Sequence, residues 1–514
     1  MENKQAFEGF VGGSWVDNNP RYDNQRTINY YTQASLTGSA KNRQISAFLQ
    51  RPGLLPCPGV DQSVGQNLRC EYTLSIGTQA VVVIDNLVYV TSGANGALTQ
   101  LEGQLDTSTG PVAISDNAGY VIIVDGTETY YTFAIGDTTL QNLTSPNYYG
   151  SFVVTYQDGT FLFVQPGTSV IFCSENSAPQ GPGGGGPITF GPDNYGIKQG
   201  YSDNAVSVIS NARELLVLGE QTGEWWYNSG ASAVFPFQRQ DGKNFQIGCV
   251  SAQTVVQLAG TILFLGQNPQ GGAIVYSMDG YVPSRISTNY IENELLKAGD
   301  LSSASALAFQ YEGHYFYALN VPQLNTTFVY DMAGVSSTAQ QPGLWLEFQS
   351  TYESGSQGRW LPKHVCYLNG QHIFGGSNGS TSGIGMFTLD AATFTDNGRM
   401  LRRVRQSPHV SENMNNIFFK LLQVDFDVGK GLVNDGINPS NAVNPSATLE
   451  CSNDGGLTWG PPIKAFLGKI GRYLQRVRWS RLGVARDRVF RVSVTDPVKA
   501  DIVYAVLDSE VGNA

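Results

Sequence analysis

The sequence is poor in charged residues: Asp, Glu, Lys and Arg make up 14% of its 514 residues, against about 25% in typical soluble domains. Long apolar runs are also missing, and the best one, AVVVI at 80–84, is far shorter than the roughly 18 residues that a membrane helix needs. The opening segment, MENKQAFEGF, lacks the apolar core of a secretory signal. We therefore expect a protein that is made in the cytosol and is not inserted into a membrane.

Cysteine and histidine are few and scattered. The six cysteines, Cys57, Cys70, Cys173, Cys249, Cys366 and Cys451, show no C-x-x-C spacing and have no histidine nearby, which argues against a zinc site. Reduced, buried thiols are the favoured interpretation, and a disulfide between Cys57 and Cys70 is the alternative. The four histidines lie apart, and neither a zinc-protease motif nor a nucleophile elbow is predicted. The sequence therefore predicts no catalytic residue, no cofactor site and no metal site.

Glycine, by contrast, is abundant, with 59 residues, and Asn, Thr, Tyr, Val and Phe recur throughout the chain. Runs of helix-favouring residues are scarce. This composition favours strands and tight turns over helices. A chain of this length is expected to form two or three domains.

From about residue 69 to 390 one pattern repeats, in which a turn separates two short apolar runs, as in SFVVTYQDGTFLFV at 151–164. Turn pairs at Asp85–Asn86, Asp116–Asn117, Asp158–Gly159 and Asn369–Gly370 each separate two predicted strands. Equivalent pairs recur about every 40–50 residues, which is the length of a propeller blade. The predicted fold is all-β: a β-propeller of irregular four-stranded blades, followed by a small C-terminal antiparallel β domain. An array of β-sandwiches is the alternative.

Two segments interrupt the pattern. The Pro/Gly-rich stretch 177–196 is expected to be a flexible excursion between strands, and no Gly-Lys-Ser/Thr follows it, which argues against a phosphate-binding loop. The stretch 287–299 is the best helix candidate, because Ile291, Leu295 and Leu296 share a face and Gly299 can end the helix.

Charge is distributed unevenly along the chain. Residues 399–499 hold 16 of the 31 Lys and Arg but only 8 of the 42 Asp and Glu, so the rest of the chain has a net charge of −19. Such asymmetry indicates two regions with different surroundings. We predict an N-terminal extended segment over 1–68 that packs on the C-terminal domain, a propeller over 69–390 and an arginine-rich β domain over 391–514.

Between residues 472 and 479, strand alternation places Leu474 and the arginines on one face, and Tyr473, Val477 and Trp479 on the other. Guanidinium groups suit phosphates and carboxylate-rich protein surfaces alike. Since the sequence pI is about 4.9 and the rest of the chain is acidic, contact with protein is favoured over tight DNA binding. The interface candidates are Arg402, Arg403, Arg405, Arg472, Arg476, Arg478, Arg481 and Arg488.

The stretch CSNDGGLTWG at 451–460 has the spacing S-x-D-x-G-x-T-W of an Asp box, a turn found in sialidases and other propellers. Asp454 can accept backbone N–H bonds across the bend, and Gly455 tolerates positive φ. A sialidase would need several such boxes at blade spacing, whereas this one lies beyond the repeats. Asp454 is therefore expected to hold a hairpin, and the protein is not predicted to be an enzyme. The residues of this structural turn are Ser452, Asp454, Gly456, Thr458 and Trp459.

Several segments resemble the packaged-DNA stabilisation proteins of short-tailed bacteriophages, which form the tail hub or nozzle. QRTINYYTQ at 25–33 and FLQRPGL at 48–54 are similar to the N-terminal strand pair of this family. The resemblance covers nearly the whole chain and departs from the family pattern at 177–196 and 431–447. Three segments are similar to the propeller strands of this family: GPVAISDNAGYVIIVDG (110–126), RELLVLGEQTGEWWYNSG (213–230) and GYVPSRISTNYIE (280–292). One segment is similar to its C-terminal hairpin: RVRWSRLGVARDRVFRVSVTDPV (476–498).

The resemblance implies a virion protein, made in the host cytoplasm, that forms a homohexameric ring on a portal-bound tail adaptor. Such a ring would retain packaged DNA and let double-stranded DNA pass at ejection without sequence-specific binding. The N-terminal segment would contact the C-terminal domain or the adaptor, and tail fibre, spike, plug or needle proteins are further expected partners. On this interpretation the acidic part of the chain can line the lumen, while the arginines bind a neighbour or the adaptor. The alternative is a glycan-binding or glycan-cleaving propeller that recognises a receptor.

Overall fold

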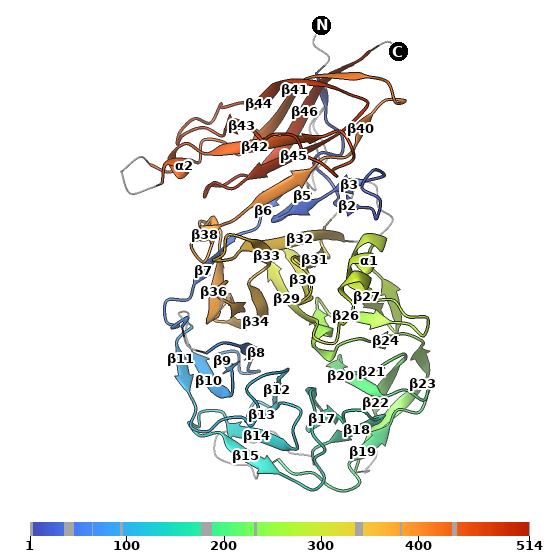
Figure 1. The fold of residues 1–514 in the computed structure, drawn as a ribbon. Coiled ribbons are helices and arrows are strands. Elements are labelled where there is room, and N and C mark those ends of the chain that lie inside the picture. Colours follow the sequence, from blue (N-terminus) through green and yellow to red (C-terminus); the bar gives the residue numbers. More distant parts are fainter. Residues whose placement is uncertain are drawn as a thin grey trace.

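The computed structural model describes residues 4–34, 46–63, 65–92, 96–175, 188–230, 234–334, 343–380, 383–433 and 439–512. These residues form a ring of sheets and, beside it, a two-sheet sandwich (Figure 1). The fold is thus nearly all-β, as predicted. Of the Pro/Gly-rich stretch, residues 177–187 lie outside the described residues, as do residues 434–438 of the loop at 431–447.

The first four sheets of the ring each have four antiparallel strands. They are β8 (Leu68–Thr73), β9 (Gln79–Ile84), β10 (Leu87–Ser92) and β11 (Leu98–Gln100); β12 (Ala113–Asp116), β13 (Tyr120–Val124), β14 (Thr129–Ala134) and β15 (Gln141–Thr144); β16 (Val154–Gln157), β17 (Thr160–Val164), β18 (Val170–Cys173) and β19 (Tyr195–Ile197); and β20 (Ala205–Asn211), β21 (Glu214–Gly219), β22 (Gly223–Asn228) and β23 (Phe237–Phe245).

Three further sheets complete the ring. They contain β24 (Gly248–Cys249), β25 (Val256–Leu258), β26 (Thr261–Gln267), β27 (Ile274–Asp279) and β28 (Val282–Arg285); β29 (Ser305–Tyr311), β30 (His314–Asn320), β31 (Thr327–Asp331), β32 (Leu344–Thr351) and β33 (Gln357–Arg359); and β34 (Pro362–Leu368), β35 (Gln371–Ser377), β36 (Ile384–Asp390) and β7 (Gly53–Pro56), with β37 (Thr395–Asp396) and β38 (Arg399–Met400) at the edge. Strand β34 contacts β29 on one side and β8 on the other, so the ring closes. The described residues thus form a propeller of seven blades.

Turn chemistry explains why the blades form where they do. Asp85, Asp158 and Asn369 adopt φ of 52°, 48° and 50° between paired strands, and Asp and Asn are the side chains that tolerate this left-handed region best after glycine. The predicted hairpins at these positions are confirmed. Apolar side chains of the middle strands then fill the space between neighbouring blades, as Val81, Val83 and others do in the first two.

The predicted helix is also confirmed. Helix α1 (Asn289–Ala298) begins after Thr288, whose hydroxyl accepts from the N–H of Ile291, and it ends at Gly299 with φ of 77°. Ile291 and Leu295 are buried against the fifth and sixth blades. Leu296, which the sequence placed on the same face, is 58% exposed. A short 3₁₀ helix, η1 (Ala252–Thr254), precedes β25.

The sandwich is built from both ends of the chain. One sheet contains β44 (Val477–Ala485), β41 (Ile417–Phe426), β46 (Ile502–Val511), β6 (Ser46–Gln50), β5 (Tyr30–Ala34) and β1 (Lys4–Ala6). The other contains β39 (Arg403–Gln406), β45 (Asp487–Val494), β42 (Ser446–Ser452), β43 (Ile463–Phe466) and β40 (Val410–Ser411), with β4 (Thr27–Ile28) joining it to β32 of the propeller. The hairpin β2 (Trp15–Val16) and β3 (Asn24–Gln25) and the short helix α2 (Ser440–Val443) lie at its periphery.

The N-terminal segment therefore connects the two domains. Its strands β1, β5 and β6 belong to the sandwich, and β7 lies in the seventh blade between β36, to which it is antiparallel, and the short strand β37. Gly53 is required there because a Cβ would come within 2.4 Å of the carbonyl oxygen of Thr395. The last blade is thus completed by a strand from the opposite end of the chain.

Candidate functional site: the arginines and exposed edge of the sandwich

The Asp-box turn connects β42 to β43 and is held by its own side chains. The Ser452 hydroxyl donates to the Asp454 carboxylate at 2.6 Å and accepts from the N–H of Gly456 at 2.8 Å. Asp454 also accepts from the N–H and hydroxyl of Thr458, at 2.9 and 2.5 Å. These bonds, with that from Ser452 the strongest, lower the pKa of Asp454. Gly455 and Gly456 have φ of 79° and 93°, as a turn of this kind requires.

The same turn packs against the N-terminal segment. The carbonyl of Gly455 accepts from the side-chain amide of Asn24 at 3.0 Å. Trp459 lies under the guanidinium of Arg491, 3.9 Å from the ring centre, and Arg491 donates to Glu450 at 2.8 Å. Every contact of Asp454 described here is internal to the fold, which gives this carboxylate a structural task.

Two of the predicted interface arginines lie in the interior. Arg403 and Arg405 of β39 are 0% exposed. Arg403 donates to the side-chain oxygen of Gln50 at 2.6 Å and to the carbonyl of Val498 at 2.5 Å. Arg405 donates to the carbonyl of Phe10 at 2.8 Å and to further acceptors in the N-terminal segment. Burial lowers the pKa of Arg405 to about 9.

The prediction that these two arginines face a partner is therefore wrong for this folded chain. Charge excess alone gave no sign of their burial, because their acceptors lie far along the chain, such as the carbonyls of Val498 for Arg403 and of Phe10 for Arg405, 95 and 395 residues away. Arg488 is likewise buried, at 4% exposure; it donates to Asn453 at 2.8 Å and stacks over the ring of Phe419 at 4.6 Å. Arg402 is half-buried, and burial lowers its pKa, with Arg491 nearby adding to the effect.

The remaining four candidates, Arg472, Arg476, Arg478 and Arg481, are exposed, and none of them forms a salt bridge with a described residue. Val477 and Trp479 are buried between them, as strand alternation predicts. Tyr473 was expected on the buried face but is 64% exposed. The reason is that residues 471–476 form turns and irregular backbone, and β44 begins only at Val477.

Five exposed apolar side chains lie in the segment 463–474, whose strand β43 contacts β44, the strand that carries Arg478 and Arg481. We name this group the edge patch: Ile463, Phe466, Ile470, Tyr473 and Leu474 are 43%, 65%, 54%, 64% and 96% exposed. The edge patch begins on strand β43 and continues into the turns after it. Strand β43 is the last strand of its sheet and pairs with β42 alone among the described residues. Exposed apolar side chains on an edge strand and on the turns that follow it, with arginines nearby in the sequence, are typical of a protein–protein contact. The pattern IKAFLGKIGRYL at 463–474 was the available signal.

Sequence reasoning also missed the ion pair that fixes the N-terminal segment to the propeller. Arg51 and Asp396 are 1% and 0% exposed in their side chains and form a salt bridge. Arg51 donates as well to the side-chain oxygen of Asn29 at 2.8 Å and to the carbonyl of Gln349 at 2.9 Å. The only local signal was an arginine before Pro52 and Gly53 between two strands.

The segment GGSNG at 375–379 has the spacing G-x-S-x-G, yet it is not a nucleophile elbow. It ends β35, and the next element is strand β36, whereas an elbow leads into a helix. The described cysteines are free thiols, so Cys57 and Cys70 are not bonded. Among the described residues, no helix is long and apolar enough to span a membrane.

Comparisons with known proteins identify both domains. A family model described as "Bacteriophage P22 Gp10, beta-propeller" matches residues 82–391, and one described as "Bacteriophage P22 Gp10, beta-sandwich" matches residues 402–510. No curated protein sequence matches. Among solved structures, BamB from Moraxella catarrhalis covers 76% of this chain and 99% of its own, at 9% identity and a TM-score of 0.35. That similarity is too low to support an argument.

Proposed function

Because this chain belongs to the bacteriophage P22 Gp10 family, a family of phage tail structural proteins, we propose that six copies form the tail hub, or nozzle, below the portal-bound adaptor. The ring closes the DNA conduit, retains the packaged DNA and lets it pass at ejection. A tail protein of this kind is part of the virion.

The observation that supports assembly is the edge patch. Its five apolar side chains are between 43% and 96% exposed, although burying a side chain of this size stabilises by about 1.5–3 kcal/mol. Apolar and aromatic anchors ringed by arginine are the composition that protein interfaces favour at their centre. Arg472 and Arg476 have no internal acceptor for their charge among the described residues, so they are available to carboxylates of a neighbouring subunit or of the adaptor.

In this proposal DNA passes between the subunits and not through the propeller. Two cavities between the inner strands of the propeller have volumes of about 390 and 420 Å³, the size of small-molecule sites. Acidic surfaces of the propeller line the lumen, since walls that bind phosphate would slow the movement of DNA. Tail fibre, spike, plug or needle proteins bind the ring at its distal end.

The first experiment measures the mass of the purified chain by light scattering and its shape by negative-stain microscopy, with and without a portal–adaptor complex. We expect six copies to join the adaptor end as a ring. A chain that stays monomeric and ignores the adaptor would contradict the proposal. A ring whose lumen is lined by Arg476 and Arg478 would contradict the proposed acidic lining of the lumen but would support the proposed ring.

Two variants test the edge patch itself. Phe466→Asp combined with Leu474→Asp places charge at its most exposed positions and should weaken assembly at least tenfold. Val282→Asp is the matched control, because Val282 is 66% exposed but lies in β28 of the propeller. Equal loss of assembly in both variants, with circular dichroism unchanged, would show that the edge patch is not the contact.

A further inference from the structure

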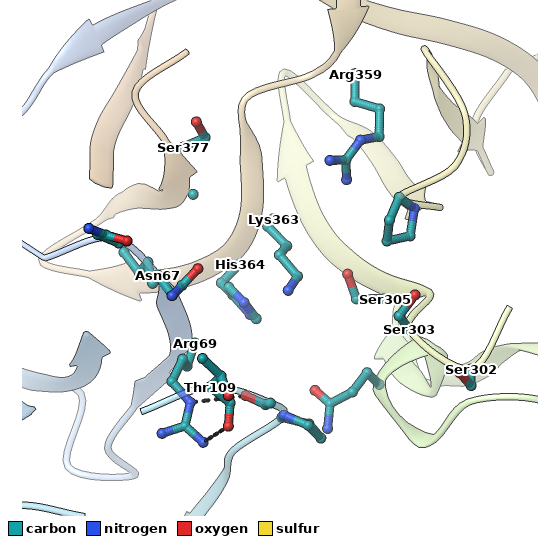
Figure 2. A pocket seen from close by; sticks show the side chains of 17 residues that line it. Asn67, Arg69, Thr109, Ser302, Ser303, Ser305, Arg359, Lys363, His364 and Ser377 are labelled. Atoms are coloured by element: carbon teal, nitrogen blue, oxygen red, sulfur yellow. Dashed lines mark hydrogen bonds between the residues drawn. The ribbon is translucent and has the colours of Figure 1, made fainter. Parts of the chain in front are cut away.

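A second feature, independent of ring assembly, is a polar cavity inside the propeller. It lies at the end of the ring where the inner strands β8, β12, β29 and β34 begin, and it has a volume of about 390 Å³. Figure 2 shows that its walls come from several blades, with Asn67 and Arg69 on one side and Ser302, Ser303 and Ser305 on the other. Cavities of this size hold small ligands.

The cavity is cationic. Arg69, Arg359 and Lys363 line it, and none of the described lining residues is Asp or Glu. His364 also lines it as a neutral imidazole, because burial, with Lys363 nearby, lowers its pKa to about 3. Arg69 contributes a fixed charge, because its guanidinium donates to the carbonyls of Gly110, Asp85, Thr107 and Thr109 and to the Thr107 hydroxyl. Burial lowers the pKa of Lys363, and the nearby charges of Arg359 and Arg69 lower it further. Such a set of like charges is unfavourable unless a negative group joins it.

Several donors in the cavity have no acceptor. The side chains of Arg359 and Lys363 form neither a hydrogen bond nor a salt bridge with any described residue. Ser305 is 4% exposed, and its hydroxyl lacks a partner. The Nε2 atom of His364 is likewise buried without a partner. Buried polar atoms are nearly always paired in folded proteins, so the unpaired Ser305 hydroxyl and His364 Nε2 indicate a site built for a ligand. Lys363, which is exposed, and Arg359, which is half-buried, bring two cations without a carboxylate partner to the same cavity.

We propose that this cavity binds a small phosphate-bearing ligand, held by Arg359, Lys363, His364 and Ser305. A guanidinium matches two phosphate oxygens at once, and an ammonium adds a point charge. In Figure 2, Lys363 and His364 reach into the space between the two walls, and Arg359 enters it from above. The ligand connects residues from the sixth and seventh blades, so binding stabilises the contact between these two blades as well.

Isothermal titration of the full-length protein with pyrophosphate, at low ionic strength, tests the site. We expect saturable binding that weakens as salt is added. Lys363→Met and Arg359→Met should each raise the Kd at least tenfold. Lys297→Met is the matched control, because Lys297 is a 62% exposed lysine of α1, and its Kd should stay within twofold of that of the unchanged protein.

Three results would overturn the proposal. The first is no saturable binding to a protein whose thermal unfolding shows it to be folded. The second is equal weakening by Lys297→Met and Lys363→Met, which would show general charge attraction. A short DNA duplex that displaces pyrophosphate at the same concentration of phosphate groups would assign the cavity to nucleic acid and exclude the small ligand.

Discussion

At the scale of single residues, Arg51 is the side chain that fixes the N-terminal segment to the propeller, just before β7. Its salt bridge with Asp396 is closed to solvent. Removing one partner of a buried pair leaves an uncompensated charge, so Asp396→Ala should lower the free energy of unfolding by about 3–5 kcal/mol. Urea unfolding followed by fluorescence measures the change.

The control for this prediction is a salt bridge at the surface. Arg213 and Asp158 are 3.1 Å apart, and the Arg213 side chain is 82% exposed. Exposed pairs contribute about 0–1 kcal/mol, so Arg213→Met should leave the unfolding midpoint nearly unchanged. Similar losses in the two variants would mean that burial of Arg51 is not the cause.

The buried carboxyl of Glu71 should make the free energy of unfolding depend on pH. Glu71 is 7% exposed, and burial raises its pKa from 4.5 to about 8. Between these values the unfolded chain releases the proton while the folded chain keeps it. Its contribution to stability is therefore complete below about pH 4.5 and declines as the pH rises to about 8. Glu71→Gln should remove this part of the decline, as urea midpoints at pH 5, 6.5 and 8 will show.

The comparison for Glu71 is Glu353, which is exposed. Glu353→Gln should follow the pH dependence of the unchanged protein. If Glu71→Gln also follows it, the carboxyl of Glu71 does not carry its proton in the folded protein.

At the scale of elements, strand β7 closes the propeller, and two neighbouring leucines test its role. Leu54 is 0% exposed and packs between β36 and the sixth blade, whereas Leu55 is 44% exposed. Leu54→Ala should cost about 2–5 kcal/mol because it leaves a cavity. Leu55→Ala removes the same atoms at the surface and should cost far less. Equal costs, measured by urea unfolding, would show that β7 does not seal the blade.

At the scale of the whole molecule, closure by β7 predicts which fragments fold. A fragment of residues 69–390 lacks β7 and leaves the edge of β36 unpaired, so it should aggregate or be degraded by protease. A fragment of residues 51–400 keeps β7 and both partners of the Arg51–Asp396 pair. We expect it to show sharp near-ultraviolet circular dichroism and resistance to protease. Equal behaviour of the two fragments would contradict the closure.

The interior arginines show the same dependence on distant parts of the chain. In the sequence, Arg403 and Arg405 are indistinguishable from the arginines of an exposed basic cluster. They are buried because Gln50, Phe10 and Thr27 bring acceptors to them from about 350–400 positions away. Desolvation of a guanidinium is tolerated only where such acceptors exist.

Local features of this protein follow from the sequence alone. The turns at Asp85, Asp158 and Asn369, the helix before Gly299 and the alternation of Val477 and Trp479 depend on φ preferences and side-chain period, which act over a few residues. The tertiary structure alone decided the count of seven blades, their closure by β7 and the burial of Arg51. These depend on contacts between the two ends of the chain, which no local pattern records.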